Sequence, residues 1–321
     1  MKNTPVSSPS MPRNLWAVLL AGGDGTRLRE LTTRIVGDDR PKQFCPIVGG
    51  DSLLRQTRSR VDPLFSADRQ IFVVSRAHET YYRRELADAE NSVVIAQPVN
   101  RGTAVGIIFA LIRVMQSDPD AVVALFPCDQ HYSDDESFRW IVRSAVAGAE
   151  QFPESVVIVG AEAEYAETEY GWIEPGRVVS QAQVPLCRVN RFWEKPALSQ
   201  ALSLLHAGCL WNTFVTVGNA ATLFELLCSE VPEVVLSVTD GLVDEDQALA
   251  YAGFPRVDFS RDILAHNTNK LLVVRDSVSG WVDLGSPGRV LDLLARNLIR
   301  PTWVREAHGF SLHDHSFGGR V

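Results

Sequence analysis

The sequence predicts an α/β fold: a doubly wound, mostly parallel sheet with helices on both faces. Short runs rich in Val, Ile, Leu and Phe recur along the chain and alternate with longer amphipathic stretches. The runs are almost continuously apolar, which is typical of parallel strands that are buried on both faces. The predicted strands are Trp16–Leu20, Ile71–Ser75, Ser92–Ala96, Ala121–Phe126, Ser155–Val159 and Lys270–Val274.

The segments between these strands have the spacing of helices. Thr103–Gln116 carries apolar residues three and four positions apart, and His78–Ala89 shows the same pattern. Glu136–Glu150 also predicts a helix, with Ser133 and Asp134 before it as capping residues. In such a fold, ligands bind beyond the carboxyl ends of the strands, so the loops that follow strands carry the functional information.

Composition limits the classes of function. A chain of 321 residues that is 45% hydrophobic can bury a large core. Its net charge of -8 argues against binding to nucleic acid or to an anionic membrane, although a local cluster of cations can still bind a small anion. No apolar run reaches the roughly 18 residues of a membrane span, and the five cysteines lack zinc-site spacing. These features predict a cytoplasmic protein with reduced thiols, and they leave homo-oligomerisation open.

A glycine-rich loop directly follows the first strand. Ala21–Leu28 reads AGGDGTRL, and its glycines let the backbone N–H groups approach a phosphate or a base. Neither the P-loop nor the G-x-G-x-x-G pattern fits, because the loop lacks Gly-Lys-Ser/Thr and has Leu28 at the third glycine position. Arg27 and Lys42 are two cations near this loop, which suits a triphosphate, whereas either cation alone could simply be a solvated surface residue.

Two aspartates are candidate metal ligands. Asp129 follows the strand Ala121–Phe126, and Asp283 lies in a Trp-x-Asp-x-Gly turn. One or two carboxylates, completed by substrate phosphates and water, form a typical Mg²⁺ site. An isolated aspartate after a strand is otherwise a turn former or a helix cap.

Several motifs together resemble one enzyme family. AGGDGTRL followed by PKQF is similar to the signature of the sugar-1-phosphate nucleotidylyltransferases, and PKQF resembles the mannose-1-phosphate guanylyltransferase branch. Further motifs follow in the order expected for that family. They are QPVNRGTAVGI (97–107), FPCDQH (126–131), EYGWIE (169–174), FWEKP (192–196), LWNTFV (210–215) and GWVDLG (280–285).

The resemblance implies a nucleotidyltransferase fold of the GT-A-like type, with sugar-binding insertions, and a role for each matching residue. The catalytic set would be Arg27, Lys42, Asp129 and Asp283, with the two aspartates holding Mg²⁺. Sugar phosphate would bind at Gly171, Glu194, Lys195 and Asn212. The nucleotide would bind at Gly22, Gly23, Gly25, Thr26, Arg27, Lys42, Gln97, Asn100, Gly102 and Thr103.

The implied substrates are GTP and mannose 1-phosphate, which would give GDP-mannose and pyrophosphate. Departures from the family pattern include a longer spacer before Pro41 and Arg101-Gly102-Thr103 in place of Arg-Asn-Thr. Two alternatives stay open. One is a glucose-1-phosphate uridylyl- or thymidylyltransferase, and the other is a catalytically silent paralogue that binds a nucleotide sugar.

The predicted domain organisation has three parts. Residues 1–13 would be a disordered tail, and 14–295 would form the nucleotidyltransferase domain. Its nucleotide-binding half would span about 14–160, and its sugar-phosphate-binding half about 161–295. Residues 296–321 would be an extension containing His308, His313 and His315, either a loose end or a metal-binding tail.

Overall fold

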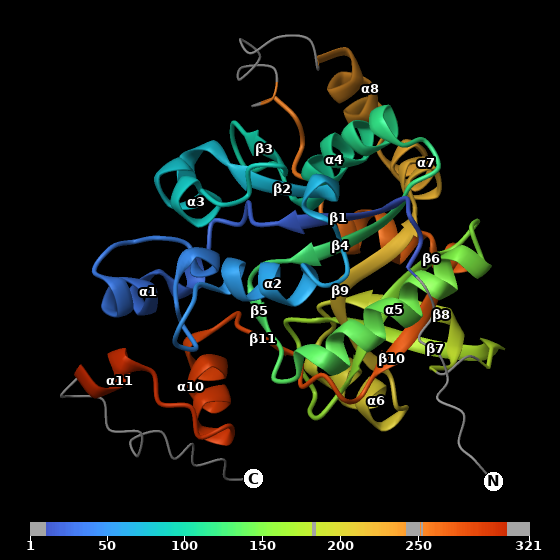
Figure 1. Ribbon diagram of the computed structural model, residues 1–321. Helices are drawn as coiled ribbons and strands as arrows, with labels where there is room; N and C mark the ends of the chain where they lie inside the picture. The colour runs from blue at the N-terminus through green and yellow to red at the C-terminus, as the bar shows by residue number, and fades with distance from the viewer. Residues whose placement is uncertain (1–10, 182–183, 242–250, 252, 307–321) are drawn as a thin grey trace, which may run out of the picture.

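Across residues 11–181, 184–241, 251 and 253–306, the computed structural model contains one nine-stranded sheet and one two-stranded ribbon (Figure 1). All strands of the large sheet except β8 and β9 run in the same direction, which confirms the prediction of a mostly parallel α/β fold. In spatial order they are β3 (Val93–Gln97), β2 (Gln70–Ser75), β1 (Leu15–Leu20), β4 (Val122–Pro127), β9 (Leu210–Asn219), β6 (Val156–Glu162), β10 (Leu271–Asp276), β8 (Leu186–Glu194) and β7 (Gly171–Ser180).

The central strands are buried on both faces, as their continuous apolar runs predict. In β1, Leu15, Ala17 and Leu19 pack into one core cluster, whereas Trp16 and Val18 pack into another. Helices cover both clusters, and Figure 1 shows α2 and α5 on one side of β1 and β4, with α4 and α7 on the other. The helices are α1 (Arg29–Val36), α2 (Leu53–Val61), α3 (Glu79–Glu85), α4 (Thr103–Ser117), α5 (Asp135–Gln151), α6 (Leu198–His206), α7 (Ala220–Glu230), α8 (Pro232–Gly241), α10 (Pro287–Arg296) and α11 (Thr302–Glu306).

Two details of the helix predictions are wrong. Asp134 alone caps α5, accepting hydrogen bonds from the N–H groups of Glu136 and Ser137, whereas the Ser133 hydroxyl is directed to the Gly280 carbonyl. The helix expected from His78 to Ala89 is shorter, because α3 ends at Glu85. Both differences concern helix ends, where side-chain capping competes with the periodic pattern.

Apolar periodicity does not reveal the three strands that pair antiparallel with one another. β7 and β8 mix buried and exposed residues, and β9 carries the polar residues Asn212, Thr213 and Thr216 among its apolar ones. β7 also contains Pro175 and Gly176 at irregular positions in its pairing with β8. These three strands lie in the second half of the chain, yet β9 inserts between β4 and β6. The two predicted halves therefore share one continuous sheet.

A small ribbon joins the middle of the chain to its later part. β5 (Gln130–His131) pairs antiparallel with β11 (Val282–Asp283), so that Asp283 lies opposite Gln130. This pairing brings Asp283 close to Asp129, which directly precedes β5. The ribbon thus brings together two aspartates that lie far apart in the sequence.

The described part of the predicted C-terminal extension packs against the N-terminal region. The Trp303 indole N–H donates to the Ile47 carbonyl at 3.1 Å, and Ile299, Trp303 and Val304 pack against the hydrophobic cluster that contains Leu28. The three histidines of the predicted tail, and most of the predicted N-terminal tail, lie outside the described residues.

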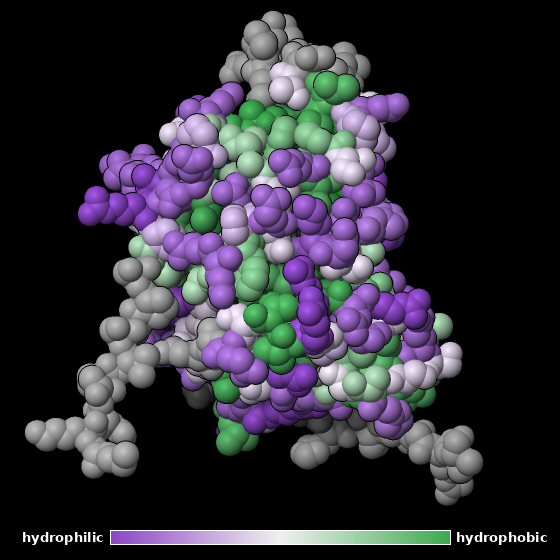
Figure 2. All heavy atoms as spheres, turned by 90° about the vertical axis from the view of Figure 1, so that its right-hand side faces the viewer, coloured by the Kyte–Doolittle hydropathy of each residue, from purple (hydrophilic) through white to green (hydrophobic). Residues whose placement is uncertain are grey.

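The surface seen in Figure 2 carries mostly hydrophilic residues, with hydrophobic ones in separate areas. Among the described helices, none combines the length and the apolar character needed to cross a membrane.

Candidate active site

A cavity of about 430 Å³ lies at the carboxyl edge of the parallel strands, where the doubly wound pattern predicts a ligand site. A second hollow of about 260 Å³ adjoins it and shares Arg27, Asn100 and Asp129 as lining residues. Every predicted site residue lines one or both of these spaces. The larger one includes Gly22, Gly23, Gln97, Gly102, Thr103, Gly171, Glu194, Lys195, Asn212 and Asp283, and the smaller one adds Gly25, Thr26 and Lys42.

The glycine-rich loop and the PKQF segment form one unit. The buried Gln43 amide donates to the carbonyls of Ala21 and Gly23, at 2.9 and 2.7 Å. Gly25 has φ of 60°, and a Cβ there would lie 2.9 Å from the Lys42 backbone nitrogen. Glycine is therefore required for both the backbone conformation and the close packing, and this packing fixes Lys42 relative to the loop.

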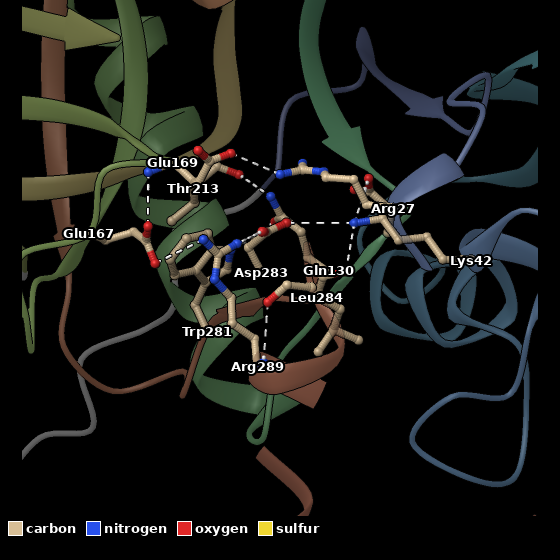
Figure 3. Close-up of polar contacts among 12 residues, drawn as sticks. Arg27, Lys42, Gln130, Glu167, Glu169, Thr213, Trp281, Asp283, Leu284 and Arg289 are labelled. Atoms are coloured by element: carbon tan, nitrogen blue, oxygen red, sulfur yellow. Dashed lines mark hydrogen bonds and ion pairs between the residues drawn. The ribbon is translucent and has the colours of Figure 1, made fainter. Parts of the chain in front are cut away.

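Lys42 lies between the two candidate metal ligands, and Figure 3 shows its contact with Asp283. Its ammonium is 3.2 Å from Asp129 Oδ2 and 3.7 Å from Asp283 Oδ1, and it donates to the Leu284 carbonyl at 3.0 Å. The Lys42 residue is buried, while Asp129 is partly open to solvent. The sequence predicted these three residues as site members, and the fold brings them into direct contact.

The carboxylates of Asp129 and Asp283, which contact Lys42, suit a hard cation. Lys42 and Arg289 contribute two positive charges, against three negative charges from Asp129, Asp283 and Glu167, which leaves one negative charge in excess. Within the part of the chain that the structure describes, no cluster of three or more His, Cys, Asp or Glu side chains could hold a metal ion. Two carboxylates are nevertheless sufficient for Mg²⁺ when phosphates and water complete its coordination.

Gln97, the candidate base reader, is buried at the end of β3. Its amide nitrogen donates to the Tyr251 hydroxyl, and its carbonyl oxygen lies near Gly22, where a Cβ would come within 3.2 Å of it. Burial also raises the pKa of Tyr251 to about 12, so this hydroxyl stays neutral at physiological pH. The contact with Tyr251 therefore holds the amide nitrogen of Gln97, and the carbonyl oxygen of Gln97 faces the glycine loop.

Asn100, Gly102 and Thr103 shape the loop that opens α4. The Asn100 side chain donates to Asp24 at 3.1 Å and accepts from the Gly102 N–H at 2.9 Å. Gly102 has φ of 90°, and a Cβ there would lie 2.1 Å from the Val257 carbonyl oxygen. Because Asn100 is engaged with both loops, its contacts support the shape of the cavity wall.

Glu194 and Gly171 lie opposite each other on β8 and β7 at the other end of the cavity. A Cβ on Gly171 would be 2.9 Å from Glu194 Oε2, an atom that is buried and has no hydrogen-bond partner among the described residues. Burial, with the nearby Asp258 charge, raises the pKa of Glu194 to about 7. A buried carboxyl oxygen without a partner at a cavity wall is suited to a ligand hydroxyl.

Lys195 and Asn212 also line this end of the larger cavity, near Glu194. Lys195 has φ of 50°, a left-handed conformation, and its backbone N–H donates to the Tyr170 carbonyl at 3.1 Å. Its ammonium is 3.9 Å from Glu194 Oε1 and half exposed. Asn212 donates to the Ser260 hydroxyl at 3.3 Å and accepts from the Phe214 N–H.

Arg27 spans the opening between the two ends. Its guanidinium lies 3.0 Å from Glu169 Oε2, and both side chains are more than half exposed. Because exposed ion pairs contribute little stability, this contact can exchange for a contact with an anion at small cost.

Three features of the site were not predicted from the sequence. Arg289 pairs with Asp283, Arg256 lines both hollows, and buried Gln130 accepts from the Trp281 indole at 2.8 Å. Arg256 and Arg289 are isolated arginines outside the quoted motifs, so no sequence pattern marks them. Gln130 lies within FPCDQH, next to Asp129, and its position in that motif was the available signal.

The comparisons with known proteins agree with these motifs. The "Nucleotidyl transferase" family model matches residues 16–297. The xanthan biosynthesis protein XanB of Xanthomonas campestris pv. campestris is 29% identical over 86% of this chain and 58% of its own length. A mannose-1-phosphate guanylyltransferase of Escherichia coli is 26% identical over 85% of this chain and 58% of its own length.

A solved structure described as mannose-1-phosphate geranyltransferase, from Thermus thermophilus, is similar with a TM-score of 0.73 and 26% identity, covering 85% of this chain and 76% of that one. The chain spans a little over half the length of the curated relatives it matches. The family match covers nearly all of the described chain, including every residue of the site. The resemblance in the motifs is thus confirmed at the level of the family, and the chain belongs to the nucleotidyl transferase family.

Proposed function

We propose that the protein transfers a guanylyl group from GTP to mannose 1-phosphate, giving GDP-mannose and pyrophosphate. The observation that carries this proposal is the pair of adjoining hollows, which together have two chemically distinct ends. One end has the glycine loop with Arg27, Lys42 and the two aspartates, and the other has the half-buried Glu194 and Lys195. Family membership supports nucleotidyl transfer, and relatives named mannose-1-phosphate guanylyltransferase support this substrate pair.

At the nucleotide end, Gly22, Gly23 and Gly25 would present backbone N–H groups to the triphosphate, with Thr26 beside them. Arg27 can fork across two phosphate oxygens, and Lys42 offers a compact charge. The Gln97 carbonyl would accept from the guanine N1–H and 2-amino groups, while Asn100, Gly102 and Thr103 shape the wall beside the base. The short contact of Gln97 with Tyr251 supports this orientation.

At the sugar end, the unpartnered Glu194 oxygen would accept hydrogen bonds from hexose hydroxyls, and Asn212 would offer a donor and an acceptor. Because Gly171 has no side chain, it leaves room for the Glu194 carboxylate beside it. The half-exposed Lys195 ammonium would bind the sugar phosphate, because its distance of 3.9 Å from Glu194 leaves its donors free to turn.

The reaction is an in-line displacement at the α-phosphorus of GTP. A phosphate oxygen of mannose 1-phosphate attacks, the bond to the β-phosphate oxygen breaks, and pyrophosphate leaves with the electron pair. The attacking phosphate is already anionic, because its second pKa is about 6, so no general base is needed. Lys195 would orient the nucleophile, and Arg27 and Lys42 would neutralise charge on the triphosphate.

Asp129 and Asp283 would hold a Mg²⁺ ion. Such an ion, when bound, supplies charge neutralisation on the phosphates without any change in protonation. Lys42 now contacts both carboxylates, and its amine has a further partner in the Leu284 carbonyl. Lys42 can therefore shift toward a phosphate while it keeps a hydrogen bond.

Transfer of an α-phosphate label tests this proposal. Incubation of the protein with α-³²P-GTP, Mg²⁺ and mannose 1-phosphate should move the label into a nucleotide sugar that comigrates with GDP-mannose. Omitting mannose 1-phosphate should leave the label in GTP. Label that stays in GTP in the complete mixture would contradict guanylyl transfer.

A further inference from the structure

Arg289 is a buried cation on α10 that pairs with two acids at once. Its Nη1 lies 2.7 Å from Asp283 Oδ2, and its Nη2 lies 2.8 Å from Glu167 Oε2. The guanidinium carbon is 4.4 Å from the centroid of the Tyr170 ring. All three charged side chains are less than a fifth exposed, so solvent screens these contacts only weakly. The planar fork of arginine suits this arrangement, in which one side chain bridges two carboxylates.

The two carboxylate oxygens of Asp283 have different partners. Oδ2 faces Arg289, whereas Oδ1 faces the Lys42 ammonium at 3.7 Å (Figure 3). Gly285 makes this arrangement possible. A Cβ at that position would lie 2.4 Å from Asp283 Oδ2 and 2.6 Å from Arg289 Nη1. The missing side chain therefore leaves the space in which the two charged groups meet.

Arg289 does not line the substrate cavity. It lines a neighbouring space of about 220 Å³, together with Tyr165, Asp292 and Arg296, and Tyr170 and Trp281 line both spaces. An effect of Arg289 on a bound substrate would therefore pass through the residues that it contacts. Of these, Asp283 and Tyr170 line the substrate cavity, and Asp283 is the one that Arg289 holds by an ion pair.

We propose that Arg289 is a positioning residue: it holds Asp283 by Oδ2, so that Oδ1 is directed toward Lys42 and the reacting phosphates. Glu167 and Tyr170 fix the guanidinium from its other sides. This inference rests on the proposed nucleotidyl transfer and adds to it a residue that orients a carboxylate without touching substrate.

Arg289→Ala tests the inference through the separation of kcat from KM. Loss of a residue that orients a ligand lowers activity by about 10- to 100-fold. We expect a fall of that size in kcat, with KM for both substrates changing less than about threefold, because Arg289 touches neither. Arg296→Ala is the matched control, since Arg296 lies on the same helix in an exposed pair with Glu164 and should leave kcat unchanged. Arg289→Lys should recover part of the activity, because one ammonium can reach only one acid well.

A double-mutant cycle separates positioning from a general structural role. If Arg289 acts through Asp283, adding Arg289→Ala to Asp283→Asn should lower kcat no further than Asp283→Asn alone. Glu167→Gln is the second variant in case Arg289→Ala does not fold. It keeps the shape, removes one anchor of Arg289, and should lower kcat in the same direction by a smaller factor.

Several outcomes overturn the inference. These are wild-type kcat in Arg289→Ala, wild-type kcat in Glu167→Gln if the alanine variant is unfolded, and multiplicative effects in the cycle. A wild-type protein that releases no pyrophosphate from any substrate pair overturns the proposed function as well. An active wild type with normal Arg289 variants overturns the inference alone.

Discussion

The Lys42 ammonium lies 3.2 Å from Asp129 Oδ2, and this contact joins the loop region after β1 to the carboxyl end of β4. Both segments leave adjacent parallel strands at the same edge of the sheet. The same ammonium is near Asp283, so one buried cation contacts both aspartates of the predicted catalytic set.

Replacing either aspartate by asparagine should greatly reduce turnover. Asp129→Asn and Asp283→Asn each remove a negative charge from the proposed metal site, and we expect kcat to fall by at least about a hundredfold. Steady-state rates at saturating Mg²⁺ measure this effect, and circular dichroism checks the fold. Asp68→Asn, at an exposed position, is the control. Normal turnover in either variant would exclude that residue from the centre.

Lys195→Ala should act on one substrate. Because the Lys195 ammonium faces the sugar end of the cavity, its loss should raise KM for mannose 1-phosphate more than KM for GTP. Lys270→Ala, a partly exposed lysine with a distant partner in Glu154, should change neither value. An equal rise in both KM values, or a rise for GTP alone, would contradict the assignment of Lys195.

Gln97 and Tyr251 should together set the preference for guanine. An unpaired polar group in the site costs about 1–3 kcal/mol, so each lost contact should change the ratio of kcat/KM for GTP and ATP by roughly five- to 150-fold. Gln97→Ala should narrow this ratio, and Tyr251→Phe should narrow it less, because the amide loses its orienting partner but remains present. A ratio that is unchanged in Gln97→Ala would show that other groups read the base.

Glu194 should make the protein less stable as pH rises. Its folded-state pKa is raised from 4.5 to about 7, so the unfolded chain ionises first, and stability present below pH 4.5 is lost as pH rises through about 7. The difference is on the order of 3 kcal/mol, at 1.36 kcal/mol per unit. Glu194→Gln should therefore gain stability relative to the wild type between pH 4.5 and 8 in urea unfolding, whereas exposed Glu90→Gln should not. Parallel pH profiles for wild type and Glu194→Gln would contradict the raised pKa.

The sequence could predict the parallel part of the fold because burial on both faces leaves a continuous apolar run, as in β1 and β4. It could not predict β7, β8 and β9, because β7 and β8 are exposed in part, β9 carries polar residues among its apolar ones, and the pairing of these strands is irregular. Their positions depend on tertiary pairing, which can outweigh local preference.

For the site, residues within motifs were predictable and residues that act through them were not. Asp129 follows a strand with a clear apolar signal, and Lys42 lies in the PKQF motif. Arg289 becomes significant only once β11 pairs with β5 and α10 brings its guanidinium to Asp283. A contact of this kind depends on the folded chain and leaves no local pattern in the sequence.

The most direct test of the proposed function is the initial rate of pyrophosphate release from each nucleoside triphosphate with each hexose 1-phosphate, at saturating Mg²⁺. We expect the highest kcat/KM for GTP with mannose 1-phosphate. A clear preference for UTP or dTTP with glucose 1-phosphate would contradict the guanylyl assignment, and no pyrophosphate from any pair would contradict catalysis by this chain.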